Sequence, residues 1–156
     1  MSPSLRDEIR QKRPFTSLEQ EAFLNVLRTA AVLADSFEQM LRPYGITLAQ
    51  YNVLRILRGA DPDGLCRNDV RGRMLNRMPD MTRLLDRMEQ ADLVTRARSE
   101  EDRRHVSTRI TAKARRLLDK IEPAVNAEHQ RRLGHLGKAR LTELIALLSA
   151  AREPIS

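Results

Sequence analysis

Apolar side chains recur every three or four residues over most of the chain, which predicts a mainly helical protein. The first long run, over residues 17–42, has the spacing of a heptad-like seam. Ser17 and Gln20 form a capping box at its start, so we expect one long helix here. A short helix over residues 3–12, which Pro14 ends, should precede it. The apolar positions of the seam are Phe23, Leu27, Ala30, Ala34, Phe37 and Leu41.

Three shorter helices are expected after this run. Thr47 caps the first of them as part of a second capping box. Asp61-Pro62-Asp63-Gly64 is a turn by composition, and the second helix begins after it at Arg67 or Asn68. Pro79 suits the first position of the third helix. One face of that helix is apolar and comprises Met81, Leu84, Leu85 and Met88.

The pattern then changes to strands. Residues 93–98 and 104–110 predict two strands joined by a charged loop, because apolar and polar side chains alternate in the second of them. A helix capped by Thr111 follows, with a kink or break expected at Pro123. A turn marked by two glycines precedes a last helix over residues 139–152.

This order of elements is typical of a winged helix-turn-helix. It predicts a mainly α fold with a two-stranded β wing, in which residues 46–110 form the winged unit. Helices over residues 17–42 and 111–152 flank that unit, and residues 1–15 are an N-terminal extension of a single domain spanning residues 1–156. The small winged unit cannot cover the apolar stripes of the flanking helices. They therefore predict a homodimer, the alternative being an intramolecular bundle.

Charge adds a candidate partner. The chain has 28 basic and 21 acidic residues, a net charge of +7, and the surplus lies after residue 66. A basic surplus suits a polyanion such as duplex DNA, although solubility alone also explains it. The single cysteine excludes an intramolecular disulfide, and no apolar run could span a membrane or act as a leader, so we expect a cytoplasmic protein.

The outer face of the third helix carries the candidate DNA contacts. Arg83 and Arg87 lie one turn apart, where a guanidinium can reach guanine or phosphate. The alternative is a solvated pair bridged to the neighbouring acids. Thr82 and Asp80 stand near the helix start, where base edges are reached. Asp80 can accept from cytosine, but a favourable interaction with the helix dipole is the preferred interpretation.

The charged loop between the strands supplies a second set of candidates. Arg104 is assigned to the minor groove, where narrow A·T-rich DNA concentrates negative potential. Arg103 is assigned to phosphate. The alternative for Arg104 is a solvated hairpin arginine.

These segments together resemble the MarR (multiple antibiotic resistance regulator) family of bacterial winged-helix repressors. The residues that carry the resemblance include Thr47-Leu48-Ala49-Gln50-Tyr51, Thr82-Arg83-Leu84-Leu85-Asp86-Arg87 and Asp102-Arg103-Arg104, and it extends from about residue 18 to residue 150. The resemblance implies an obligate homodimer that binds a palindromic operator through two winged units. It also implies a small anionic or phenolic effector, bound between the dimer interface and the winged unit, that loosens the grip on DNA.

The resemblance also assigns roles to single residues. Asp86 would pair with the wing arginine and hold the wing against the recognition helix, and Asp102 would brace the hairpin. Candidates for lining the effector pocket are Phe37, Tyr44 and Tyr51, with core packing as the alternative. The chain departs from the family where Asp92 and Ala114 replace glycines and where Pro79 removes a backbone donor. Asp92 is then expected to adopt a positive φ at some cost.

Three other classes of protein are weighed against a repressor. A non-specific architectural DNA-binding protein would use the same basic surface. A helical protein-interaction module would not need the exposed arginines, so their presence argues against it. No nucleophile–base pair, phosphate-binding glycine loop or metal-ligand spacing indicates an enzyme, a cofactor or a metal site. Cys66, at the start of the second helix, is more often an inert small residue than a redox sensor.

Overall fold

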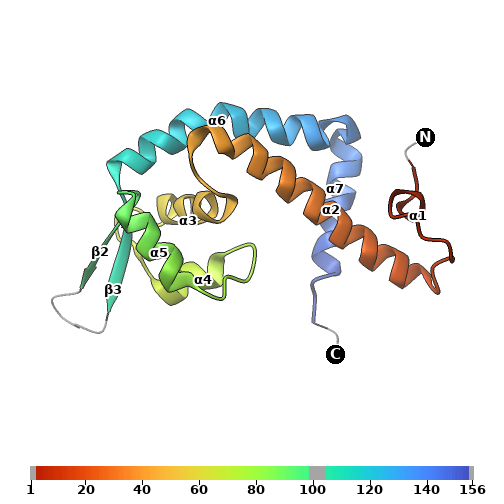
Figure 1. Cartoon of the computed structure of the whole chain (residues 1–156), viewed down its shortest axis with the longest axis horizontal. Helices are drawn as coiled ribbons and strands as arrows, with labels where there is room; N and C mark the ends of the chain where they lie inside the picture. Colours follow the sequence, from red (N-terminus) through yellow and green to blue (C-terminus); the bar gives the residue numbers. More distant parts are fainter. Residues whose placement is uncertain (1–2, 99–104, 155–156) are drawn as a thin grey trace. The chain divides into compact units, whose positions relative to one another are not determined.

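The computed structural model of the chain describes residues 3–98 and 105–154. The chain divides into two compact units, Met1–Gln39 and Met40–Ser156, each of which is described by itself. Helices make up most of both units, and the second also holds a small sheet (Figure 1). Within the described residues, no helix combines the length and the apolar character that crossing a bilayer requires.

The first unit consists of a short helix and most of a long one. Helix α1 (Leu5–Glu8) is shorter than the predicted helix over residues 3–12, because the chain turns at Arg10, whose φ is +53°. Helix α2 (Leu18–Leu41) confirms the predicted long helix. Its start is capped as predicted, since the Ser17 hydroxyl accepts from the backbone N–H of Gln20 at 3.1 Å. Several apolar side chains of α2 are exposed, including Leu18, Phe23, Val26 and Leu27.

The second unit begins with the winged helix-turn-helix. A 3₁₀ turn, η1 (Arg42–Tyr44), ends at Gly45 and leads into α3 (Leu48–Gly59). The predicted capping box of α3 is present, because Thr47 and Gln50 each accept from the other's backbone N–H. The remaining elements are β1 (Leu65–Cys66), α4 (Arg67–Arg73), α5 (Met81–Gln90), β2 (Val94–Arg98) and β3 (Val106–Ile110).

Apolar side chains from four helices of this unit meet in one core. α3, α4 and α5 pack together, and the sheet and the following helix α6 (Ala112–Leu133) close the core. Burial of these side chains is the main term that stabilises the arrangement. The fully buried members include Val53, Leu54, Leu57, Val70, Leu85, Met88, Val94, Ala114 and Leu118.

The sheet has three strands in the order β1-β3-β2, all antiparallel. The wing hairpin pairs Val94 with Ile110 and Arg98 with Val106, which confirms the two predicted strands. The third strand, β1, pairs Leu65 with Thr108 and was not predicted, because two residues show no alternation.

Gly64 makes the close approach of β1 to β3 achievable. Its φ is +76°, a left-handed conformation that side chains with a Cβ disfavour. A Cβ at this position would lie 2.6 Å from the Thr108 carbonyl oxygen and 2.6 Å from the Ser107 hydroxyl. The Ser107 hydroxyl also donates to the Asp63 carbonyl at 3.1 Å, which fixes the turn against β3.

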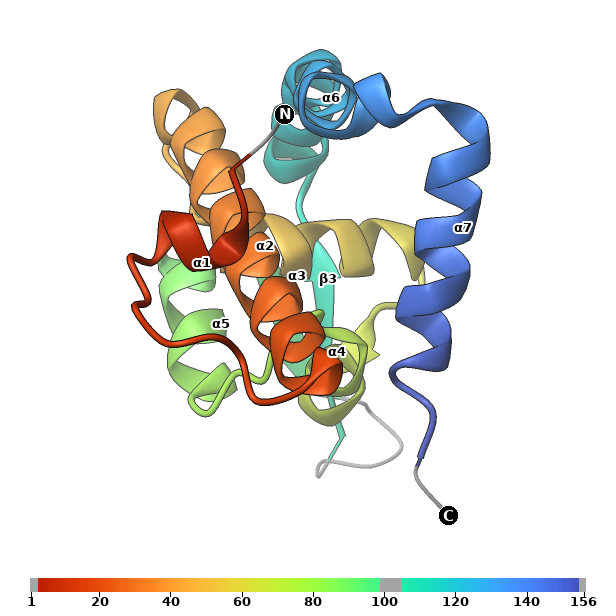
Figure 2. The same cartoon turned by 90° about the vertical axis from the view of Figure 1, so that its right-hand side faces the viewer.

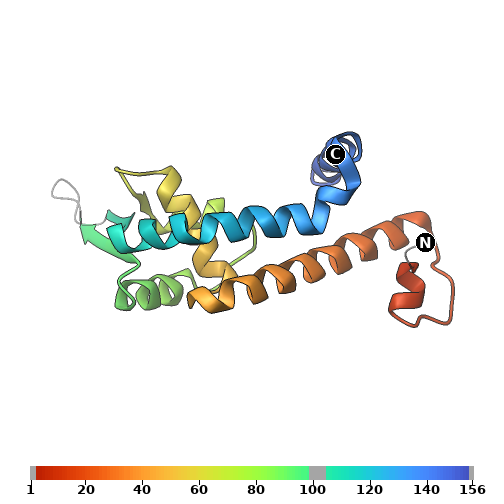
Figure 3. The same cartoon turned by 90° about the horizontal axis from the view of Figure 1, so that it is seen from above.

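The C-terminal helices of the second unit are α6 and α7 (Gly137–Ala150). Of the kink or break predicted at Pro123, the break is wrong, since Pro123 lies inside α6. Figure 3 shows α6 as one continuous helix. A proline removes one helix hydrogen bond, and burial of Ile121 and Val125 on either side holds the helix together. The predicted glycine turn is confirmed as η2 (Gly134–Leu136), after which α7 leaves the direction of α6 (Figure 2).

We predict that Gly64→Ala destabilises the protein by about 2 kcal/mol or more, because it adds left-handed strain and a clash with the β3 backbone. Gly72→Ala is the matched control, since Gly72 lies in α4 with nothing within 4 Å of its would-be Cβ. That control should be neutral or stabilising by up to about 1 kcal/mol. Urea unfolding of both variants tests this, and equal midpoints would contradict the role given to Gly64.

Candidate nucleic-acid interface

Helix α5 is defined at its start by Asp80. The prediction that Pro79 is the first helical residue is wrong, because α5 begins at Met81 and Asp80 is its N-cap. The Asp80 carboxylate accepts from the backbone N–H of Arg83 at 3.0 Å, which satisfies one of the free donors of the first turn. Asp80 therefore has the helix-start role that the sequence favoured for it.

The two faces of α5 separate as predicted. Met81, Leu85 and Met88 are buried, and Leu84 is half-buried. Thr82, Arg83 and Arg87 are exposed on the other side. The exposed face therefore presents one hydroxyl and two guanidinium groups, a set that can contact base edges and phosphates.

Arg83 and Arg87 are not neutralised by the acids of their own helix. Among residues 3–98 and 105–154, no hydrogen bond or ion pair engages either guanidinium. The alternative of a bridge to Asp86 or Glu89 is absent, because both carboxylates bind Arg96 of β2 instead. Two unpaired cations on the exposed face of a helix favour binding of an anionic partner.

Arg96 joins the wing to α5. Its Nη2 lies 2.6 Å from Asp86 Oδ1 and 2.6 Å from Glu89 Oε2, and its Nε lies 3.1 Å from the same Glu89 oxygen. We call this group of three residues the Arg96 bridge. The hydrogen bond to Arg96 lowers the pKa of Glu89, and the same bond raises the pKa of Arg96.

The sequence predicted a partner for Asp86 but did not identify it as Arg96. A signal was present, because side chains alternate along a strand and Arg96 shares a face with the buried Val94. That face packs against α5, so a half-buried arginine there needs acids from the helix.

Arg67 is a second residue that the sequence analysis missed. It is the first residue of α4, and its Nη1 donates to the Thr82 hydroxyl at 2.9 Å. Thr82 is thus held from the neighbouring helix rather than left free to rotate. A cleft of about 360 Å³ lies between α4, α5 and the sheet, and its lining includes Arg67, Thr82, Arg96 and His105.

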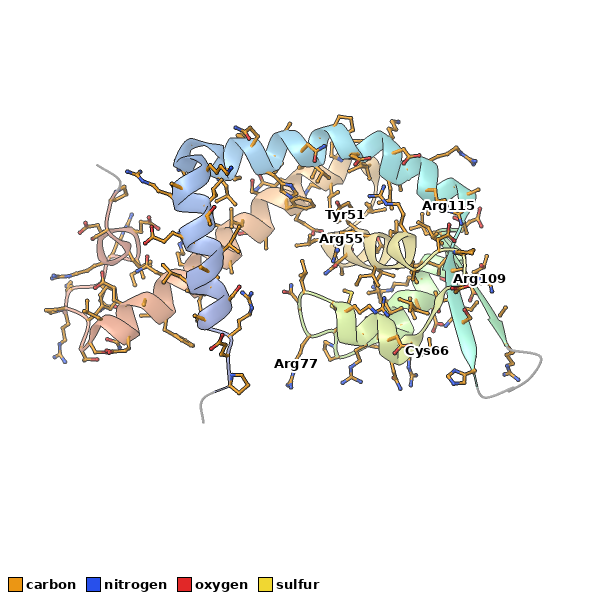
Figure 4. The ribbon with its side chains drawn as sticks, turned by 180° about the vertical axis from the view of Figure 1, so that it is seen from behind. Tyr51, Arg55, Cys66, Arg77, Arg109 and Arg115 are labelled. Carbon is orange, nitrogen blue, oxygen red and sulfur yellow. The ribbon has the colours of Figure 1, made fainter. Side chains whose placement is uncertain are left out.

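Cys66 has a local structural role at the junction of β1 and α4 (Figure 4). Its sulfur accepts from the backbone N–H of Asp69 at 3.4 Å, and its thiol donates to the Asp69 carboxylate at 3.1 Å. It is therefore the N-cap of α4. In the part of the chain that is described, no three His, Cys, Asp or Glu side chains gather where they could hold a metal ion.

Comparisons with known proteins agree with this geometry. The family model of the transcriptional regulators SarA/Rot matches residues 35–121. A solved MarR transcription factor from Planctomyces limnophilus is 37% identical, with a TM-score of 0.67, over 88% of this chain and 99% of its own. AbsC, a MarR family regulator from Streptomyces coelicolor, is 28% identical, with a TM-score of 0.79, over 90% and 95%. The HTH-type regulator FarR of Neisseria gonorrhoeae is 25% identical over 87% of this chain and 92% of its own.

The chain belongs to the MarR family of winged-helix transcription regulators. It is accordingly a DNA-binding transcription regulator.

In this MarR protein, the turn that follows α5 contains Asp92, where members of the family usually have glycine. Asp92 has a φ of +56°, as expected for the residue that replaces that glycine. The N–H groups of Asp92 and Leu93 donate to the carbonyls of Glu89 and Met88, which is the Schellman pattern. The Thr111 hydroxyl donates to the Asp92 carbonyl at 2.8 Å and fixes the turn to the start of α6.

The structure leaves several predicted site residues of this MarR protein untested. Asp102, Arg103 and Arg104 lie outside the described residues, so their contacts stay predictions. Phe37 belongs to the unit Met1–Gln39, and Tyr44 and Tyr51 belong to the unit Met40–Ser156. Tyr44 lines a cleft beside α6 whose lining does not include Tyr51. Tyr51 is half-buried in α3, and that burial raises its pKa.

We predict that the Arg96 bridge stabilises the protein at neutral pH and not in acid. Because the folded-state pKa of Glu89 is lowered, its contribution is present above the unfolded pKa and is lost as pH falls through the folded value. Glu89→Gln should therefore destabilise the protein at pH of about 7 but not below about 3.

Urea unfolding at the two pH values measures this effect. Glu143→Gln, an exposed acid of α7, is the control for loss of a surface carboxylate. A Glu89→Gln effect of equal size at both pH values would show that packing, and not the ion pair, carries the contribution.

Proposed function

We propose that this regulator is a sequence-specific, dimeric repressor of palindromic duplex DNA and that a small-molecule effector releases it. The observation that carries DNA binding by this face is the pair of exposed, unneutralised guanidinium groups of Arg83 and Arg87. Asp80 fixes one end of α5 and the Schellman turn at Asp92 fixes the other. A helix held at both ends presents its side chains to a groove at little entropic cost.

The roles within the site follow from chemistry. Arg83, one turn inside α5, is proposed to contact guanine or phosphate, with Arg87 and the exposed hydroxyl of Thr82 beside it. Asp80 is proposed to act mainly on the helix and not on a base. In the wing, Arg104 is proposed to enter the minor groove, with Arg103 on phosphate and Asp102 bracing the hairpin.

Known structures of the same fold support both DNA binding and its regulation by a small-molecule effector. CouR, a repressor 23% identical to this chain, has been solved bound to a 23-mer DNA duplex. CouR from Rhodococcus jostii has also been solved with p-coumaroyl-CoA, and DNA binding by BpsR of Bordetella bronchiseptica is regulated by 6-hydroxynicotinic acid. The relatives compared are regulators and not enzymes. We propose the same for this chain, with the cytoplasm, where bacterial DNA lies, as its place of action.

The dimer is proposed from apolar surface that the single chain leaves exposed. On α2, Leu18 is 81% exposed and Phe23 is 66% exposed, and on α7, Ile145 is 65% exposed and Leu147 is 62% exposed. Side chains of this size gain roughly 1.5–3 kcal/mol each when burial is complete. A second copy of the chain is the occupant that a palindromic operator requires.

We predict that Arg83→Ala weakens binding to the operator by about 1–3 kcal/mol, and that Arg104→Ala weakens it and lowers the salt slope slightly. Arg140→Ala on α7 is the control for loss of one exposed cation. Fluorescence anisotropy on the DNA upstream of its own gene and on scrambled DNA, at two salt concentrations, measures the affinity and its salt dependence.

Equal affinity for the two DNAs would instead indicate an architectural protein, and no binding to either would indicate an interaction module.

We predict that the wild-type chain has twice its monomer mass of 17.9 kDa in solution and that Phe23→Glu shifts it toward the monomer. A buried carboxylate at an apolar interface costs several kcal/mol, whereas an exposed one costs little. Thr29→Glu, an exposed position on the same helix, is the matched control. Sedimentation velocity distinguishes the species, and a wild type that is monomeric at all concentrations would refute the dimer.

A further inference from the structure

One hydrogen bond between exposed side chains joins α4 to the recognition helix α5. The Nη1 of Arg67 donates to the Thr82 hydroxyl at 2.9 Å, across fifteen residues of sequence. The two helices pack against each other in the winged unit (Figure 1). Thr82 lies in the first turn of α5, the part of a recognition helix that reaches base edges. The bond therefore lies where the protein is proposed to meet DNA.

The backbone of Arg67 is attached to the sheet. Arg67 is the first residue of α4 and follows Cys66, which pairs with Ser107 of β3. The Cys66 sulfur also accepts from the backbone N–H of Asp69 at 3.4 Å, which fixes the first turn of α4. Arg67 therefore reaches Thr82 from a fixed point of the fold.

The bond determines which hydrogen-bonding role the Thr82 hydroxyl keeps for a partner. A hydroxyl has one donor and two acceptor lone pairs, whereas a guanidinium has donors only. Arg67 can occupy a lone pair of Thr82 Oγ1, but it cannot accept the hydroxyl proton. The positive charge beside that oxygen also disfavours the approach of a second donor. The Thr82 hydroxyl is thus left as a donor.

The hydroxyl proton of Thr82 has no acceptor among residues 3–98 and 105–154. Thr142 of α7 shows the contrasting arrangement, because its hydroxyl donates to the Lys138 carbonyl one turn back at 2.9 Å. A threonine inside a helix often uses its proton in this way. The Thr82 side chain is exposed, so its donor is available to a partner outside the protein.

We propose that Arg67 is a positioning residue that makes Thr82 select a hydrogen-bond acceptor on one base of the operator. In the major groove, guanine presents the acceptors N7 and O6, whereas cytosine presents the amino donor N4. A donor hydroxyl beside a cation therefore favours guanine over cytosine at the base that it contacts. The inference rests on the proposed sequence-specific function, and it makes a residue of α4 contribute to the specificity of α5.

Arg67 has a second possible role, and base preference separates the two. Its guanidinium keeps N–H donors that Thr82 does not use, and no ion pair within the described ranges engages it. Such a guanidinium can bind phosphate, a contact that raises the affinity for every DNA sequence alike. A positioning role changes the preference among bases instead.

The first arm of the test measures the Thr82 side chain in the free protein. Three-bond couplings from its methyl carbon to the backbone nitrogen and carbonyl carbon give χ1. We expect one rotamer in the wild type and averaging in Arg67→Met, because helical threonine otherwise divides between two rotamers. Arg71→Met removes another exposed arginine of α4 and should leave the rotamer unchanged. Averaging in the wild type, or one rotamer kept in Arg67→Met, would overturn the positioning role.

The second arm measures base preference by selection from a library of random DNA duplexes followed by sequencing. Thr82→Val keeps the shape of the side chain without its hydroxyl, so the position at which it flattens the preference is the base that Thr82 contacts. There we expect the wild type to prefer guanine over cytosine by about three- to tenfold, as one hydrogen bond supplies. The preference should fall to within about twofold in Arg67→Met and persist in Thr82→Ser, which keeps the hydroxyl.

Combined variants and the control complete this arm. Arg67→Met with Thr82→Val should lose no more of the preference than Thr82→Val alone, because both changes act on one contact. Arg71→Met should change the affinity for all sequences by the same factor and keep the preference. The same uniform change in Arg67→Met would show that Arg67 binds phosphate only, and it would overturn the proposal. So would a preference for cytosine at this position.

Failure of the proposed function would give a different result. A wild type that selects no sequence would refute the sequence-specific regulator, whatever the Thr82 couplings show. A wild type that selects an operator at which Thr82→Val changes no base preference would refute this inference alone. Circular dichroism checks that each variant folds, and the couplings of the wild type need no variant.

Discussion

The charge of the proposed DNA-binding face depends on where two carboxylates of α5 are directed. Asp86 lies three residues after Arg83, and in an isolated helix neighbours at this spacing attract one another. Arg96 from β2 takes both Asp86 and Glu89 instead, at 2.6 Å each. One arginine therefore attaches the wing to α5 and leaves the outward arginines with their full charge. A surface ion pair of this kind adds little to stability, so its main consequence is electrostatic and geometric.

The same helix is fixed at both ends by contacts that involve few residues. Asp80 caps its start, and Asp92 and Thr111 close its end against α6. Arg67 holds Thr82 from the neighbouring helix. Burial of Met81, Leu85 and Met88 sets how closely α5 packs on the core. The polar contacts set the rotation of α5 about its axis and the residues at which it begins and ends. Precise placement of a recognition helix needs both, because apolar packing alone is not directional.

The sequence predicted those features that are determined locally. Capping residues such as Thr47 act on their own helix, and the positive φ of Asp92 follows from its place in a family pattern. Features that depend on tertiary pairing were missed. β1 exists only because Leu65 meets Thr108, and its two residues have no pattern of their own. Pro79 was placed inside α5 because proline suits a first turn, but the Asp80 carboxylate makes the better cap and moves the start by two residues.

The residues of the candidate site also divide into those determined locally and those that depend on tertiary pairing. Arg83, Arg87 and Thr82 could be assigned from helical periodicity, since exposure on one face is a one-dimensional property. Arg96 and Arg67 could not, because their partners lie seven to fifteen residues away on other elements.

Both ends of α5 are polar, but they differ in how easily a ligand can disturb them. The bond from Arg83 N–H to Asp80 is local to the helix, and no cation from another element shares it among the described residues. At the other end, the Ala91 carbonyl is held by Lys113, an exposed cation that belongs to a different helix. The adjacent Asp92 adopts a conformation that costs of order 1 kcal/mol or more for a residue with a side chain. The C-terminal end of α5 is therefore the end at which a modest change in binding energy can alter the recognition helix.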